Sequence, residues 1–119
     1  MLLTERPALS PMKGKTYDTY GSADLNPATV AAAMARALVI EFEEHNSSFL
    51  GSYFLCGTLS EENIVVRATQ PPPPYADAGD PGDERFPITI EVNATDRADA
   101  LRGLILTIPG MHVLSRRVL

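Results

Sequence analysis

The fold of this chain is decided by residues 86–119, FPITIEVNATDRADALRGLILTIPGMHVLSRRVL. The first part alternates apolar and polar residues, so Ile88, Ile90 and Val92 share one face of a predicted strand over residues 87–93. The period then changes, and apolar side chains recur three or four positions apart, at Ala98, Leu101, Leu104, Ile105 and Ile108. This spacing predicts an amphipathic helix directly after the strand.

Both ends of this helix have recognisable signals. Asp96 can cap the N-terminus, and Asp99 stands in the first turn as in a capping box. Pro109-Gly110 is expected to end the helix, because proline has no backbone donor and restricts the residue before it. Residues 111–119 then either continue as helix or form a final strand, and we prefer the strand.

A second helix is predicted from residue 26. Asn26 is a favourable N-cap and Pro27 suits the first helical position. Alanine, the best helix former, follows at high density. We expect this helix to include Glu41, Glu43 and Glu44 at its C-terminal end and to stop at residues 45–48.

A hairpin is predicted to follow this helix. Residues 52–58 and 63–69 are rich in strand-forming side chains, and a short polar connection joins them. In the second strand Ile64, Val66 and Ala68 would face the core, whereas Arg67 and Thr69 would face out. Val65 on the outer face indicates that this face is partly covered.

Residues 1–24 are predicted to form an extended N-terminal arm. Lys13 and Lys15 make it locally basic, although the whole chain is acidic. Residues 16–20 alternate and could add a short edge strand. The arm is either a disordered terminus or a segment held by a neighbouring subunit.

Residues 71–85 are predicted to form a long proline-rich acidic loop. Four consecutive prolines at 71–74 cannot pair in a sheet and favour an extended conformation. The loop is either a flexible insertion, an acidic loop that lines a ring, a clasp on a neighbouring subunit, or a ligand for an aromatic groove. Together these elements predict a single α+β domain over residues 25–119, with two helices packed on a mostly antiparallel sheet of three to five strands.

Composition narrows the classes of function. The net charge of -5 argues against nucleic-acid binding, which needs a basic surface. Aromatic residues make up 7% of the chain, which supplies few stacking platforms for single strands. No apolar run reaches the length of about 18 residues that a membrane helix needs. The single cysteine, Cys56, cannot form an internal disulfide.

Candidate catalytic groups are few. His45 and His112 are the only histidines, and neither has the spacing of a metal site, so we expect no metal and no cofactor. His45 follows Glu41 by four residues, a spacing that is common and mostly inert at helix ends. A Cys56–His112 nucleophile pair would need the fold to bring the two together. We therefore expect no enzymatic activity.

The order of the elements resembles that of phage tail-terminator and neck ring proteins. The similarity runs from about Asn26 to Leu119 and is nearest over residues 87–110, a strand, an acidic helix start and an Ile-Pro break. That family consists of small α+β subunits that assemble into rings at the end of the tail tube. The resemblance implies a structural role in which the arm and the loop contact neighbouring subunits.

We therefore expect a non-enzymatic structural subunit of a homo-oligomeric ring in a virion, assembled in the host cytoplasm. Its partners would be copies of itself and neighbouring structural proteins, with neither nucleic acid nor membrane involved. The alternative is a small acidic bacterial binding protein, an immunity protein or antitoxin of the cytoplasm, that masks a basic partner surface. The candidate partner-binding residues are Lys13, Lys15, Tyr17 and Tyr20 in the arm, Pro72, Pro73, Tyr75, Asp77, Asp80, Asp83 and Glu84 in the loop, and Arg116 and Arg117 near residue 119.

Overall fold

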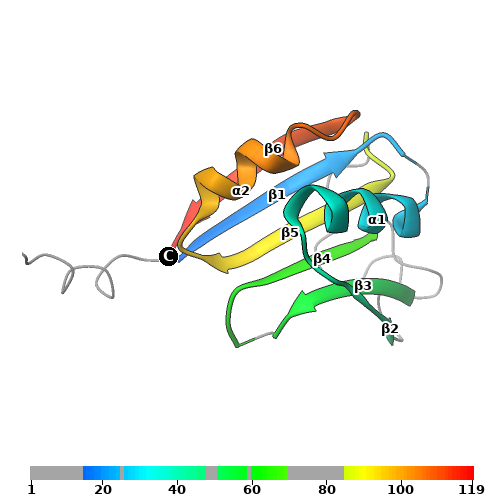
Figure 1. Cartoon of the computed structure of the whole chain (residues 1–119), viewed down its shortest axis with the longest axis horizontal. Coiled ribbons are helices and arrows are strands. Elements are labelled where there is room, and N and C mark those ends of the chain that lie inside the picture. The colour runs from blue at the N-terminus through cyan, green and yellow to red at the C-terminus, as the bar shows by residue number, and fades with distance from the viewer. Residues whose placement is uncertain (1–14, 25, 48–50, 59, 70–84) are drawn as a thin grey trace, which may run out of the picture.

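The computed structural model describes residues 15–24, 26–47, 51–58, 60–69 and 85–119. It has the predicted α+β architecture, with two helices packed on an antiparallel sheet (Figure 1). In chain order the elements are β1 (Thr16–Ser22), α1 (Pro27–Leu38), β2 (Glu43–Ser47), β3 (Gly51–Gly57), β4 (Asn63–Ala68), β5 (Ile88–Thr95), α2 (Ala98–Ile105) and β6 (Met111–Val118).

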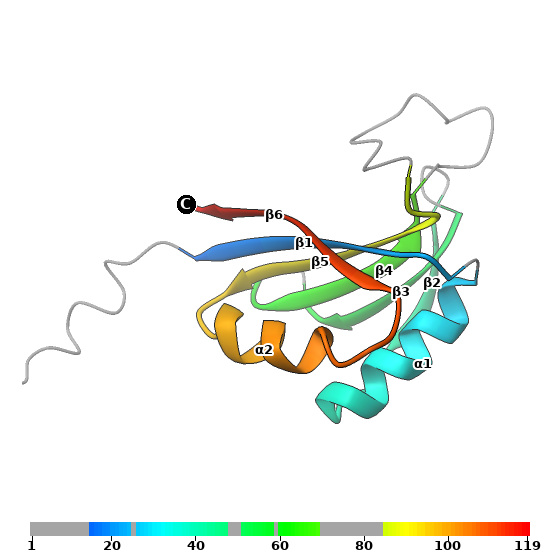
Figure 2. The same ribbon diagram turned by 90° about the horizontal axis from the view of Figure 1, so that it is seen from above.

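The six strands form one sheet in the order β2-β3-β4-β5-β1-β6, and every neighbouring pair is antiparallel. Both helices lie on the same face of this sheet (Figure 2). In the described part of the chain the opposite face has no helix over it. The sheet is larger than the predicted three to five strands, because β2 forms from a segment expected to be the end of a helix.

The core lies between the sheet and the helix layer. Ile88, Ile90 and Val92 are fully buried there, which confirms the face predicted from their alternation. The helices supply one buried stripe each, as expected for amphipathic helices packed on a sheet. The remaining buried apolar members of this cluster are Tyr20, Val30, Ala31, Met34, Ile64, Val66, Leu101, Ile105 and Met111.

Helix α1 begins as predicted but ends sooner. The Asn26 side chain accepts a hydrogen bond from the Ala28 backbone N at 2.9 Å, so the N-cap is confirmed. The helix ends at Leu38, where Val39 adopts a left-handed conformation with φ 56°. The prediction that Glu43 and Glu44 belong to the helix was wrong. They begin β2, because pairing with β3 and the packing of the intervening apolar residues outweigh local helix propensity.

Strand β1 is not an edge strand. It lies between β5 and β6 and pairs with both, so residues 16–22 of the predicted arm belong to the domain. Strand β6 confirms the preference for a final strand over a continued helix. Since β5 and β6 both run antiparallel to β1, they are parallel to each other, and α2 connects them across the helix layer.

Helix α2 follows β5 as predicted, with different ends. Arg97 occupies the N-cap position without a side-chain cap, and Asp96 instead lies 3.6 Å from the Lys15 ammonium. The helix ends at Ile105, before Pro109 is reached. Leu104, which the spacing assigned to the core, is exposed.

Arg67 and Thr69, predicted to face away from the core, are outside the core cluster but are nevertheless buried. Neighbouring strand partners account for this. The Arg67 guanidinium lies 3.2 Å from the Glu91 carboxylate on β5, and the Thr69 hydroxyl lies 2.8 Å from the Thr89 hydroxyl. Val65 is buried too, in agreement with the covered outer face that its apolar side chain predicted.

Candidate functional site

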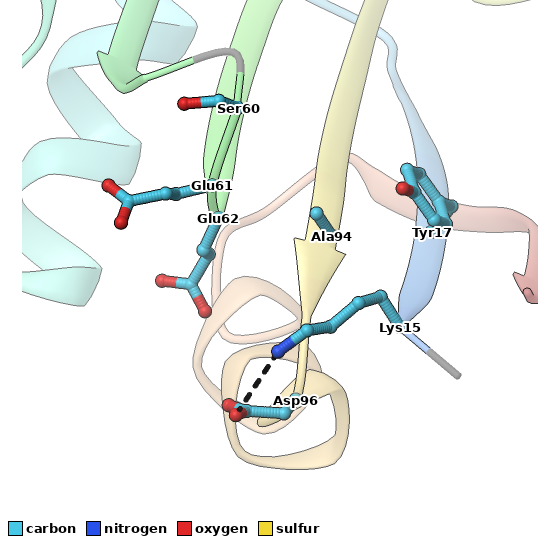
Figure 3. A pocket seen from close by; sticks show the side chains of 7 residues that line it. All are labelled: Lys15, Tyr17, Ser60, Glu61, Glu62, Ala94 and Asp96. Atoms are coloured by element: carbon cyan, nitrogen blue, oxygen red, sulfur yellow. Dashed lines mark ion pairs between the residues drawn. The ribbon is translucent and has the colours of Figure 1, made fainter. Parts of the chain in front are cut away.

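A charged cleft of about 380 Å³ opens at the end of the sheet where β1 begins and β5 ends (Figure 3). Three separate segments supply its walls: the start of β1, the connection between β3 and β4, and the turn from β5 into α2. Antiparallel pairing brings these segments together, because β4 and β1 both begin where β5 ends. The lining residues are Lys15, Tyr17, Ser60, Glu61, Glu62, Ala94 and Asp96.

The backbone is irregular at the floor of this cleft. Ala94 has a positive φ of 54°, and the pairing of β1 with β5 shifts register between Thr16 and Asp18. A bulge of this kind bends the strand and redirects the side chains that follow. It is followed by a turn in which the Thr95 hydroxyl accepts a hydrogen bond from the Arg97 backbone N at 3.1 Å.

Glu62 is the most firmly held acid of the cleft. Its carboxylate accepts hydrogen bonds from Arg97 Nε at 3.0 Å, Arg97 Nη2 at 2.7 Å and the Thr95 hydroxyl at 2.6 Å. The hydrogen bonds from Arg97 lower the pKa of Glu62, and the single hydrogen bond from the Thr95 hydroxyl also lowers it. Glu62 therefore stays ionised and joins the β3–β4 connection to the start of α2.

The remaining charges of the cleft are more exposed. The Lys15 side chain reaches across the end of β5 towards Asp96, and both groups remain accessible to solvent (Figure 3). Glu61 accepts a hydrogen bond from the Thr58 hydroxyl at 3.2 Å. On the neighbouring strand, the Arg117 guanidinium lies 5.8 Å from the centroid of the Tyr17 ring. Exposed charges of both signs suit an interaction with a charged protein surface.

A second ionic cluster joins the sheet to α2, and its central carboxylate, Asp18, is buried. The buried Asp18 carboxylate accepts hydrogen bonds from Arg116 Nε at 2.7 Å and Nη2 at 2.9 Å. Arg116 Nη1 also donates to Asp99 on α2 at 2.8 Å. Arg102 Nη2 lies 3.6 Å from Asp18, and the Tyr20 hydroxyl lies 3.5 Å from it. This network links β1, β6 and α2.

The candidate catalytic groups are separated from one another. His45 stacks on Tyr53 at 5.5 Å between ring centroids, whereas His112 lies against Phe86 at 4.9 Å. Cys56 is on β3 and three strands separate it from β6, so no Cys56–His112 pair forms. Burial raises the pKa of the Cys56 thiol, which disfavours the nucleophilic thiolate. Among the residues that the structure describes, no three acidic, histidine or cysteine side chains are grouped as metal ligands.

The predicted partner-binding residues have different outcomes. Lys15, Tyr17 and Arg117 lie together at the cleft end of the sheet. Tyr20 is fully buried in the core, and Arg116 is bound to Asp18 and Asp99, so neither is the free surface contact that we expected. The other predicted residues lie outside the described part of the chain: Lys13, Pro72, Pro73, Tyr75, Asp77, Asp80, Asp83 and Glu84.

The acids of the cleft were missed by sequence reasoning. The sequence indicates only a polar connection at Glu61 and Glu62, and a helix cap at Asp96. A local signal exists in the pair of acids within a short hairpin connection. This signal does not identify the partner of Glu62, because Arg97 is 35 positions away in the sequence and only the fold brings the two side chains into contact.

Comparison with known proteins adds no relative. No protein-family model matches the chain, and no curated protein gives a significant match. Neither described helix has both the length and the apolar character needed to span a membrane.

Proposed function

We propose that this protein is a non-enzymatic structural subunit of a homo-oligomeric assembly, a tail-terminator or neck ring of a virion. The observation that supports this proposal is the strand β6 at one edge of the sheet. Its outer side has no backbone partner among the described residues, and its eight residues leave much of their surface exposed. Val118 and the adjoining Leu119 are 63% and 67% exposed.

An open edge of this kind favours association. An edge strand presents a row of unpaired backbone donors and acceptors, and apolar side chains on it add surface that association would bury. Proteins that act as monomers usually shield such an edge with a short strand, a proline, charged side chains, a bulge or a covering loop. Strand β6 is long and contains no proline, and it has one bulge and two arginines, of which Arg116 is bound to Asp18 and Asp99.

The ionic cluster makes this edge rigid. Asp18 on β1 and Asp99 on α2 hold the Arg116 guanidinium from two sides, so β6 is joined both to the sheet and to the helix layer. An interface that is ordered before association loses less conformational entropy on binding. The mechanism that we propose is accordingly geometric: a rigid two-layer subunit whose edges set the angle between neighbours.

The virion assignment is supported by the order of elements from Asn26 to Leu119, which resembles that of tail-terminator and neck ring subunits. In the same proposal, the partners are further copies of this chain and neighbouring structural proteins of the particle.

Native mass spectrometry and light scattering of the full chain test the homo-oligomer. The expected result is one closed oligomer with a defined subunit number over a range of micromolar concentrations. A monomer at every concentration would overturn the proposal. Detection of the protein in purified particles by peptide mass spectrometry tests the virion assignment separately, and its absence from them would refute that assignment.

A second candidate function is the masking of a basic partner by an acidic surface. Glu41, Glu43 and Glu61 are exposed at the same end of the sheet, and a hollow of about 370 Å³ lies beside the first two. An immunity protein or antitoxin would use such acids against a toxin surface. A monomer that forms a salt-sensitive one-to-one complex with a basic protein encoded beside it would favour this alternative.

A further inference from the structure

We infer that the joint between subunits is a continuous sheet, in which β6 of one copy pairs antiparallel with β2 of the next copy. This inference rests on the proposed homo-oligomer and names the two surfaces that would form it. Strands β2 and β6 are the two ends of the strand order, and neither has an outer backbone partner among the described residues.

The direction of the strands permits this pairing. Six strands that are all antiparallel to their neighbours place β2 and β6 in opposite directions. A second copy in the same orientation therefore presents its β2 antiparallel to β6 of the first. Both helix layers then remain on one side of the extended sheet, and Figure 2 shows this single-sided arrangement within one subunit.

The two faces of the sheet also match across this joint. Residues paired across the strands share a face, and the row that starts at Glu43 on β2 reaches Ser115 on β6. Arg117 is two positions from Ser115 and shares that face, whereas Glu44 and Arg116 are on the helix side. If Glu43 lies opposite Arg117, Glu44 therefore lies opposite Arg116 with no change of face.

Charge selects this pairing over the symmetric ones. The β2 edge carries two acids, and the Glu43 side chain is 83% exposed. Of the two arginines of β6, Arg116 is already offset by Asp18 and Asp99, so Arg117 is the main positive charge at the joint. A β6–β6 contact would bring like arginines together, and a β2–β2 contact would do the same with acids. The pairing of unlike edges repeats head to tail and closes into a ring when the rotation allows it.

Charge reversal tests the joint. Arg117→Glu and Glu43→Lys should each raise the midpoint concentration for assembly about tenfold, because an opposite-charge pair across strands becomes a like-charge pair. An equimolar mixture of the two variants should restore assembly to the wild-type midpoint. When the two variants alternate, one acid again lies opposite one base at every joint of a ring with an even number of subunits, and at all joints but one of a ring with an odd number. Arg36→Glu, a reversal at an exposed position of α1 outside both edge strands, is the matched control and should change nothing.

The outcomes separate the joint from the proposed function. Wild-type protein that is monomeric refutes both. Wild-type oligomers that persist unchanged in both single variants refute the joint and leave the homo-oligomer standing. Loss of assembly in Arg117→Glu without loss in Glu43→Lys also refutes it, because β2 would then take no part in the joint. A mixture that fails to recover assembly refutes it as well, provided that circular dichroism shows both variants folded.

Disulfide trapping provides an independent measurement. Glu43→Cys and Arg117→Cys chains, each also carrying Cys56→Ala, should form an oxidised dimer when mixed. Neither chain alone should form this dimer to a comparable extent, because each has only one half of the joint. Equal cross-linking in the separate chains would overturn the pairing of β6 with β2.

Discussion

Replacing Asp18 by asparagine should lower the free energy of unfolding by about 3 kcal/mol, because it breaks a buried ion pair that joins β1 to β6. The matched variant, Asp99→Asn, changes a second carboxylate bound to the same guanidinium of Arg116. It should leave the stability close to that of the wild type. The comparison contrasts a buried carboxylate with an exposed one on the same arginine.

The magnitude follows from the environment of the two acids. Asp18 is 1% exposed and accepts two charge-assisted hydrogen bonds from Arg116, at 2.7 and 2.9 Å. Removing one partner of a buried ion pair costs about 3–5 kcal/mol, and asparagine keeps the shape and one acceptor, so the lower value applies. The Asp99 side chain is 90% exposed, so water replaces its single contact.

Urea denaturation followed by circular dichroism measures both variants. With an m-value of about 1.5 kcal/mol/M, Asp18→Asn should lower the midpoint by about 2 M urea. A loss below about 1 kcal/mol, or equal midpoints for Asp18→Asn and Asp99→Asn with unchanged m-values, would refute the reasoning that burial makes this pair strong.

Four further substitutions have expected outcomes. Val39→Gly should raise the melting temperature by about 4 °C, because a β-branched residue with φ 56° is strained and the exposed side chain loses no packing. Glu62→Gln should make the urea midpoint of unfolding less sensitive to acid. The lowered pKa of Glu62 means that its carboxylate stabilises the fold above the usual value of 4.5, and that this contribution is lost as the pH falls below it. Gly103→Ala should stabilise α2 by about 1 kcal/mol, since nothing lies within 4 Å of the new Cβ. Gly21→Ala should destabilise the protein by about 1–3 kcal/mol, because its Cβ would lie 2.5 Å from a ring atom of Phe86. Denaturation curves that show the opposite signs would contradict these expectations.

The cleft shows where prediction from the sequence reaches its limit. The basic charge of the arm and the alternation of residues 16–20 favour Lys15 and Tyr17 as partner-binding residues, and both line the cleft. The acids that complete it, Glu61, Glu62 and Asp96, were not grouped with them. Their proximity follows from the pairing of β5 with both β4 and β1, which no local pattern encodes.

The sequence by itself determined the elements whose signals are local. The alternation of Ile88, Ile90 and Val92, the change to helical spacing after them, and the cap at Asn26 each depend on a few neighbouring residues, and each is present in the structure. Side-chain periodicity and capping act within one or two turns, so they can be read without knowledge of distant partners.

Only the tertiary structure decided what depends on residues far apart in the chain. Residues 43–47 form a strand because β3 pairs with them, although their position suggested the end of a helix. Strand β1 lies inside the sheet because β5 and β6 flank it. Arg116, which the sequence presents as a free charge, is held by an aspartate 98 positions away. Strand order and burial determine such contacts, and burial then decides whether a charge is a structural link or an exposed surface for a partner.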